Sequence, residues 1–508
     1  MKISRFIPKI SYSTGLALLA LLVFVYIFDR KIDINGDNCY YYIFASSLAS
    51  GNGYTDMLGN ATAHFPPGYP LLMALVRLFT GSVVAQKVLN LLFLFGAVLM
   101  LFYTLVAEGV KKSLAFIVGA AVLVTPHILE FSRMMMSEPS CIFFIMLSLW
   151  AFVHLTTDNK IEWRSPWLYI FLFATVYTFF IRTQAMVFVG AFVMALLLAR
   201  RFRMALLLSG AFVAGYAPWA LRSALLGLEQ SRYIHQLDFT KVFATLKMLV
   251  VQVMPESVLP LFRVHYGAEP SLLLYFIAFF LLTLTFFGFY RLKRLRFVLP
   301  LFLVGNIALV SIMDTPSYYR YMIIVLPVVT AGLFAGVWGL CDILCRRILK
   351  RSFSPWFLLL LFVPMFFYCK DTSKHTVWGL HREARTGYPI TVRAFFAMGA
   401  EAATRGDSCI VASRKPELIY VHKGVRGVRL KESYTNVQIV RDLLADNVDF
   451  IILENMGFRY TREVLYPCFK EHPAFFEPLT YTSTPVNVLF KFHKERARVW
   501  VEGFGDEE

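Results

Sequence analysis

Long apolar stretches constrain the fold of this chain more than any other feature. Eleven of them lie in the first 369 residues, and each is long enough for a helix to cross a membrane. They cover residues 11–28, 83–106, 113–129, 139–156, 166–183, 184–199, 204–221, 270–290, 297–313, 322–345 and 354–369. Arg182 and Gln184 interrupt the boundary between the fifth and sixth stretches. The pattern predicts an α-helical polytopic membrane protein with about 11 transmembrane helices.

The composition excludes the two main alternatives to a membrane protein. Only 16% of the 508 residues are charged and 58% are hydrophobic, whereas soluble globular chains carry about 25% charged residues. A disordered chain is excluded as well, because disorder goes with few aromatic residues and this chain has 49 Phe and 25 Tyr.

The basic excess belongs to the membrane part. Residues 1–369 hold 30 Lys or Arg and 15 acidic residues, while residues 370–508 hold 20 and 18. Of those 30 basic residues, 18 fall in six short segments between alternate apolar stretches. The positive-inside rule then predicts a cytoplasmic N-terminus and an extracytoplasmic C-terminal domain. We expect membrane lipids as partners and no nucleic acid.

The chain divides at residue 369. Residues 1–369 form the predicted transmembrane domain, with a first outer loop at 29–82 and another at 222–269. Loops of this length are usually functional, and the first contains amphipathic stretches at 39–50 and 66–80 that suit a membrane surface. Residues 370–508 are predicted to form a small extracytoplasmic α/β domain.

Alternating patterns predict the elements of this C-terminal domain. Helices are expected at 390–405, 437–445 and near 462–470, and strands at 409–412, at 448–453 and within 479–492. Such alternation favours a small, mostly parallel sheet.

The spacing of the cysteines shows no CxxC pair, so no structural zinc site is expected. It leaves open whether Cys409 and Cys468 form a disulfide.

Two acidic residues and one histidine at the outer ends of the stretches are candidates for chemistry. Asp37 precedes an aromatic amphipathic helix, where it either stabilises the helix start or acts as a general base. Glu138 either forms a loop salt bridge with Arg133 or faces Asp37 across a cavity, where it orients a hydroxyl or binds a cation. His64 in HFPPGYP is either a surface or a site residue, and Gly68 permits the turn there.

Three arginines lie at predicted outer membrane ends: Arg182, Arg222 and Arg320. Each alone is explained by contact with lipid headgroups. Together, beside Tyr319, they indicate a site for an anionic lipid phosphate, because the planar guanidinium bonds two oxygens. The sequence contains no Walker loop, dinucleotide fingerprint, HExxH or GxSxG triad.

Several of these residues fall in motifs that resemble the GT-C superfamily of membrane glycosyltransferases. The nearest branch contains protein O-mannosyltransferases, the aminoarabinose transferase acting on lipid A, and bacterial polyprenyl-phosphate-sugar transferases. The resemblance rests on D-x-x-Y-Y at Asp37–Tyr41, on residues 51–54, 65–70 and 132–139, and on Arg320-Tyr321. It covers about residues 30–330 and the trailing domain.

The resemblance implies transfer of a sugar from a polyprenyl-phosphate donor to a lipid, glycan or protein hydroxyl in cell-envelope glycan biosynthesis. It also implies that the reaction takes place at the outer face of a bacterial cytoplasmic (inner) membrane. Inversion is implied, with Asp37 as general base and Glu138 as a second-loop acid. The implied substrate-binding residues are Tyr40, Tyr54, His64, Tyr69, Arg133, Arg182, Arg222, Tyr319 and Arg320. No cofactor is certain, and a divalent metal remains an alternative.

The sequence departs from the family at two places. Asn38 follows Asp37 where protein O-mannosyltransferases have a second acid. His64 and Phe65 stand where the aminoarabinose transferase has an acid and a lysine, so another residue must contact the donor phosphate.

Two other functions stay open: a lipid or glycan transporter or flippase, and a membrane-anchored binding protein. A flippase would place polar residues near span centres.

Overall fold

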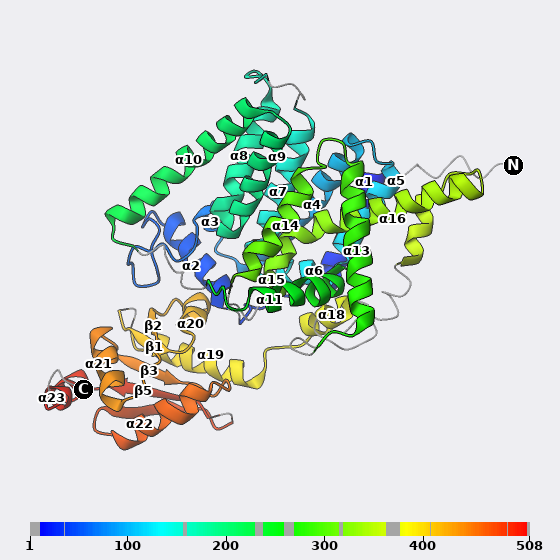
Figure 1. Ribbon diagram of the computed structural model, residues 1–508. Helices are drawn as coiled ribbons and strands as arrows, with labels where there is room; N and C mark the ends of the chain where they lie inside the picture. The colour runs from blue at the N-terminus through cyan, green and yellow to red at the C-terminus, as the bar shows by residue number, and fades with distance from the viewer. Residues whose placement is uncertain are drawn as a thin grey trace. The chain divides into compact units, whose positions relative to one another are not determined.

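The computed structural model describes residues 11–34, 36–155, 160–228, 237–258, 269–313, 318–361, 376–406, 408–484 and 486–504 (Figure 1). Two compact units make up the chain. Unit 1 comprises Met1–Asp29, Ala63–Leu72 and Val84–Arg385. Unit 2 comprises Arg30–Thr62, Met73–Val83 and Thr386–Glu508. A large part of the first outer loop therefore groups with the C-terminal residues.

Unit 1 is helical. Its helices are α1 (Tyr12–Ile27), α4 (Val83–Ala107), α5 (Lys112–Leu123), α6 (Pro126–Ser132), α7 (Glu138–Val153), α8 (Pro166–Ile181), α9 (Met186–Leu198), α10 (Phe202–Leu225), α11 (Val242–Met248), α12 (Met254–Val258), α13 (Leu272–Arg291), α14 (Val298–Ser311), α15 (Tyr318–Met322), α16 (Leu326–Ile348) and α18 (Val377–Arg385). Pro126, Pro139 and Pro166 lie in the first turns of α6, α7 and α8. A proline fits there because the first N–H groups of a helix have no intrahelical acceptor.

Several of these helices are long and apolar enough to cross a membrane, so the protein is a multi-pass membrane protein. Within the described residues, α4, α10, α13 and the segment Tyr318–Ile348 meet that condition, and α5 and α6 meet it only when taken together as a pair bent by 61°. Five shorter apolar helices, α1, α7, α8, Thr183–Leu198 and α14, fall at other predicted stretches. The stretch at 354–369 extends beyond the described residues, and the total of eleven spans stays a prediction.

The interruption at Arg182 separates two helices. α8 ends at Ile181, Arg182 has an extended backbone (φ −146°, ψ 124°), and a short 3₁₀ turn at Thr183–Ala185 leads into α9. The two polar residues in this stretch thus mark a change of chain direction. The guanidinium of Arg182 projects from this break and not from the middle of a helix.

α13 and α16 pack unusually closely. A Cβ on Gly288 would lie 1.8 Å from the carbonyl oxygen of Gly332, and one on Gly336 would lie 1.9 Å from the carbonyl oxygen of Leu284. Gly332 and Gly336 form a small-xxx-small pattern on α16, which lets helix backbones approach inside a membrane. Van der Waals contact between the two backbones therefore fixes this crossing.

Unit 2 contains a five-stranded sheet in the order β2-β1-β3-β5-β4. The strands are β1 (Val411–Ser413), β2 (Gly427–Arg429), β3 (Phe450–Leu453), β4 (Phe476–Tyr481) and β5 (Val488–Phe492). β1 pairs in parallel with β2 and β3, whereas β5 pairs antiparallel with β3 and β4. The predicted α/β domain is confirmed, but the prediction of a mostly parallel sheet is wrong. The short connection from Tyr481 to Val488 has no room for a crossover helix, so β4 and β5 must be antiparallel.

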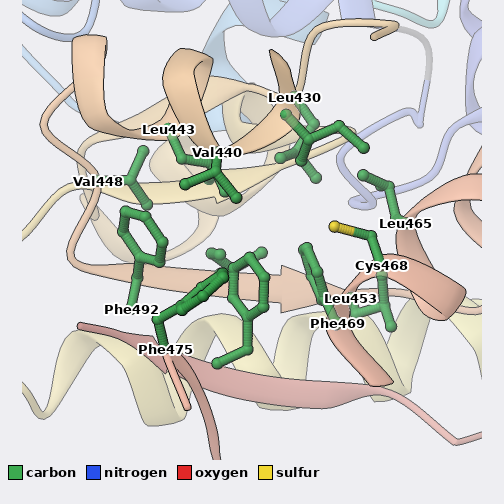
Figure 2. Packing of buried hydrophobic residues seen from close by; sticks show 14 of the residues in the cluster. Leu430, Val440, Leu443, Val448, Leu453, Leu465, Cys468, Phe469, Phe475 and Phe492 are labelled. Carbon is green, nitrogen blue, oxygen red and sulfur yellow. The ribbon is translucent and has the colours of Figure 1, made fainter. Parts of the chain in front are cut away.

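Helices cover both faces of this sheet. Buried side chains of α21 (Asn436–Ala445), α22 (Tyr466–Glu471) and α23 (Lys494–Glu502) form one core with Ile451 and Phe492 (Figure 2). Side chains of α19 (Ile390–Ala403) and α20 (Pro416–Lys423) form the other with Ile452. Successive strand residues point to opposite faces. Cys409 and Cys468 lie in different cores and are both free thiols.

Helix α2 (Gly36–Ala49) also belongs to unit 2. Cys39 of α2 is buried in the core that contains α19 and α20. A Cβ on Gly36 would lie 2.7 Å from Oε1 of Glu417, so the start of α2 lies close to the carboxylate of Glu417 at the start of α20. The remaining short helix of the first loop, α3 (Gly68–Arg77), begins in unit 1 and ends in unit 2.

We predict that Gly336→Ala destabilises the protein. Its methyl group would overlap the backbone of α13, and overpacking of this kind costs about 3 kcal/mol of unfolding free energy. The control is Gly190→Ala on α9, where an added Cβ meets no atom within 4 Å. Thermal unfolding in detergent should occur at a lower temperature only for Gly336→Ala. Equal unfolding temperatures for both variants would contradict the close crossing of α13 and α16.

Candidate active site

One buried carboxylate in unit 1 gathers two arginines that are far apart in the sequence. Glu138 is fully buried at the first position of α7. Its Oε1 forms an ion pair with Nη1 of Arg182, at 2.7 Å, and accepts a hydrogen bond from Nε of Arg320, at 2.6 Å. Its other oxygen, Oε2, is buried and has no hydrogen-bond partner among the described residues. These three side chains are called the Glu138 cluster below.

The neighbours of the cluster are polar and aromatic. Nη1 of Arg182 also donates to Oγ of Ser137, at 3.1 Å. The guanidinium of Arg320 lies 5.7 Å from the ring of Phe131, and the ring of Tyr319 lies 6.2 Å from the same phenylalanine. Tyr319 and Arg320 of α15 therefore both lie against α6. This places the cluster where the chain enters α7, leaves α8 and passes through α15.

The cluster can attract an anion. A charge among membrane helices is tolerated when it is paired, and here one carboxylate faces two guanidinium groups. Guanidinium groups held in fixed orientation suit phosphate oxygens, because their N–H groups form a planar fork.

Arg133 belongs to a different ionic group. Its Nη1 and Nη2 pair with Asp29, at 2.7 Å, and with Glu383, at 2.6 Å. Asp29 also pairs with Lys87, at 2.7 Å, and Lys87 is fully buried in α4. The prediction of a salt bridge between Arg133 and Glu138, one of the two alternatives for Glu138, is therefore wrong. The reason is that Arg133 follows α6 and reaches the end of α1, whereas Glu138 starts α7 and faces α8 and α15.

His64 lies on the loop that leads into α3, and Tyr69 is the second residue of that helix. Tyr69 is fully buried and donates to Oδ1 of Asn90, at 3.0 Å. The amide of Asn90 in turn donates to the carbonyl oxygens of Met134 and Met136. Tyr69 thus links α3 to α4 and the segment before α7. His64 is half-buried, and its ring lies 4.4 Å from that of Phe65.

Arg222 is not paired with Glu138. It lies near the end of α10, where its guanidinium is 5.0 Å from the ring of Trp219 on the same helix. The described structure therefore brings together two of the three predicted arginines.

Asp37, Tyr40 and Tyr54 lie in unit 2. Asp37 is partly exposed in the first turn of α2, where the helix dipole favours a carboxylate. The ring of Phe44 lies 6.1 Å from that of Tyr40 and 4.9 Å from that of buried Tyr54. Burial, with a smaller contribution from the charge of Asp37, raises the pKa of the Glu417 carboxyl. Asp37 therefore acts electrostatically on a second acid.

Asp37 and the Glu138 cluster belong to different compact units, and their convergence on one pocket stays a prediction.

Sequence reasoning missed the ionic group of Asp29 and Lys87. The signal was present, because a lysine inside an apolar stretch requires a partner at membrane depth. Among the described residues, no group of three or more His, Cys, Asp or Glu side chains is placed to hold a metal ion.

Comparison with known proteins connects this architecture to membrane glycosyltransferases. No protein-family model and no curated protein matches the sequence. ArnT from Cupriavidus metallidurans, solved with undecaprenyl phosphate, is similar in structure, with a TM-score of 0.61 and 12% identity over 94% of this chain and 97% of that chain. The chain has the GT-C fold. At the level of the fold, the resemblance inferred from residues 30–330 and the trailing domain is thereby confirmed.

A second GT-C enzyme is similar as well. An Archaeoglobus fulgidus oligosaccharyltransferase tethered with an acceptor peptide has a TM-score of 0.52, with 12% identity over 96% of this chain and 75% of that chain. AglB from the same organism, with an inhibitory peptide and a dolichol-phosphate, has a TM-score of 0.50, with 12% identity over 95% and 74%. The GT-C fold thus accounts for both the helical unit and the sheet-containing unit.

We predict that Glu138→Gln strongly destabilises unit 1. The variant keeps the shape of the side chain but removes the negative charge that the buried guanidinium of Arg182 and the largely buried one of Arg320 share, which costs about 3–5 kcal/mol. The matched control is Glu401→Gln, which removes a half-exposed carboxylate that is 2.6 Å from Arg405 and should cost less than about 1 kcal/mol. Thermal unfolding in detergent measures both. Similar changes in unfolding temperature for the two substitutions would show that the Glu138 cluster contributes little to stability.

Proposed function

We propose that this protein transfers a sugar from a polyprenyl-phosphate donor to a hydroxyl group of a lipid, glycan or protein at the outer face of a bacterial cytoplasmic membrane. The observation that carries the proposal is the pair of arginines on buried Glu138 within a GT-C fold. Structures with this fold have been solved with undecaprenyl phosphate and with a dolichol-phosphate. Both ligands share the phosphate and the long isoprenoid chain of the proposed donor.

The proposed role of the Glu138 cluster is to hold the donor phosphate. The lipid phosphate leaves with the electrons of the bond to the sugar, so negative charge grows on its oxygens in the transition state. Arg182 and Arg320, oriented by Glu138, stabilise that charge. Because the guanidinium groups are already held by the protein, little reorganisation is needed during the reaction.

The proposed role of Asp37 is that of general base. Its carboxylate takes the proton from the acceptor hydroxyl, the oxygen forms a bond to the anomeric carbon, and the bond between that carbon and the phosphate oxygen breaks. Attack opposite to the leaving phosphate inverts the anomeric centre. The position of Asp37 in the first turn of α2 supports this role, because Cys39 of the same helix is buried in the core with α20, which fixes the place of α2.

We predict that Asp37→Asn abolishes sugar transfer and leaves folding unchanged. Loss of a general base slows a reaction by about 10²–10⁴-fold. The assay uses purified protein in lipid nanodiscs with polyprenyl-phosphate donors that carry a radiolabelled sugar, and it measures transfer of label to an extracted envelope fraction. Asp33→Asn, four residues earlier in the same loop, is the control and should retain activity.

Three outcomes decide between the readings. Transfer by Asp37→Asn at nearly the wild-type rate would exclude Asp37 as the base. Loss of transfer in both Asp variants would point to a general effect on the loop. Movement of intact labelled donor between bilayer leaflets, without cleavage of the sugar–phosphate bond, would identify a transporter and overturn the proposal.

A further inference from the structure

A cavity of about 500 Å³ lies in unit 2 at the carboxyl ends of its three parallel strands. The walls come from the segments that follow each strand: Arg414 after β1, Glu432 and Tyr434 after β2, and Phe458 with Tyr460 after β3. We call this cavity the strand-end pocket. It involves none of the residues assigned above to the donor or to the base.

The topology of the sheet creates this pocket. β1 is followed by α20, which packs on one face, whereas β3 is followed by the segment leading to α22, which packs on the other. The chain therefore leaves two adjacent parallel strands in opposite directions and opens a crevice between their ends. Ligands of open α/β sheets bind at this position.

Buried polar groups lie at and beside the pocket, whose lining includes Arg414 but not Ser413 or Glu454. Arg414, only 6% exposed, donates from Nη2 to Oε1 of Glu432, at 2.6 Å, and from Nη1 to the carbonyl oxygen of Leu430. Its Nε, Oγ of Ser413 and Oε2 of Glu454 are buried without a hydrogen-bond partner among the described residues. Burial raises the pKa of the Glu454 carboxyl to about 7, so this group can donate as well as accept near neutral pH. Such groups require polar atoms from a ligand or water.

Aromatic rings form the walls. The guanidinium of Arg414 lies 5.4 Å from the ring of Phe458 and 5.2 Å from the ring of Tyr460. Tyr460 is fixed by a hydrogen bond from its hydroxyl to the carbonyl oxygen of Ser433. Tyr434 packs edge-on against Tyr460 at 5.8 Å and is 75% exposed, so most of its ring is available for contact.

The charges that line the pocket cancel. Arg414 is paired with Glu432, and Arg459 with Glu463 at 2.6 Å. The lining therefore contains two positive and two negative side chains, with no excess for a phosphate or a carboxylate. Paired guanidinium and carboxylate groups offer both donors and acceptors, and aromatic rings offer flat apolar faces. A neutral carbohydrate matches this combination, because it has hydroxyl groups at its edges and C–H groups on its faces.

From the strand-end position, the orphaned buried polar groups and the balanced charge, we propose that the strand-end pocket binds a neutral sugar unit of a glycan. This binding is separate from the proposed transfer reaction and does not depend on Asp37 or Glu138. The α/β unit thereby acts as a glycan-binding module of the chain.

The test measures binding of neutral sugars to the full-length protein in lipid nanodiscs, because common glucoside and maltoside detergents carry competing sugars. The probes are glucose, galactose, mannose, arabinose, N-acetylglucosamine and their disaccharides, followed by saturation-transfer NMR and titration calorimetry. At least one probe should bind to the wild type and to Asp37→Asn. Tyr434→Ala should weaken that binding at least tenfold, and Tyr434→Trp should retain it.

The control is Tyr481→Ala, which removes a tyrosine of similar exposure (72%) from β4 of the same unit and should not change binding. Both tyrosines are exposed, so neither substitution threatens folding. The proposal is overturned if no sugar binds, if Tyr434→Ala binds as well as the wild type, or if inorganic phosphate displaces the bound sugar.

Discussion

Neutralisation of charge inside the membrane unit is the constraint on which the rest of this structure depends. Glu138 is buried between helices and is held by Arg182 and Arg320, which come from the break after α8 and from α15. Asp29, Lys87 and Arg133 are buried in a second ionic group that connects the ends of α1, α4 and α6. An unpaired charge at such depth costs several kcal/mol. Each group therefore ties together helices that apolar packing alone would leave free to slide or rotate.

The two units use different physical means to hold their elements in place. In unit 1 lipid is as apolar as the helix surfaces, so ionic groups and backbone contact at Gly288 and Gly336 determine the packing. In unit 2 two apolar cores on either side of a sheet determine it. Neither kind of packing requires a particular amino acid at more than a few positions. This explains how a chain with 12% identity to ArnT of Cupriavidus metallidurans retains the fold.

Sequence alone predicted the features that depend on local pattern. Apolar length located the helices, and the polar pair at Arg182 and Gln184 marked a real break. Features that depend on contacts between distant parts of the chain were not predicted. These are the partner of Arg133, the burial of Lys87 and the packing of α2 with the C-terminal residues. β2 was missed because Gly427–Arg429 contains only one large apolar residue, whereas the equally short β1 falls in an apolar run at residues 409–412. The strand-end pocket could not be predicted either, because the order of the strands in the sheet brings its residues together.

The central claim is that the Glu138 cluster recognises the phosphate of a polyprenyl-phosphate lipid. Native mass spectrometry of the purified protein, with equal amounts of undecaprenyl phosphate and undecaprenol added, tests it most directly, since the two lipids differ only in the phosphate. The account predicts that the wild type retains the phosphate and not the alcohol, and that Arg320→Lys, which cannot present a planar fork, loses this preference. Equal retention of both lipids by the wild type would contradict the account.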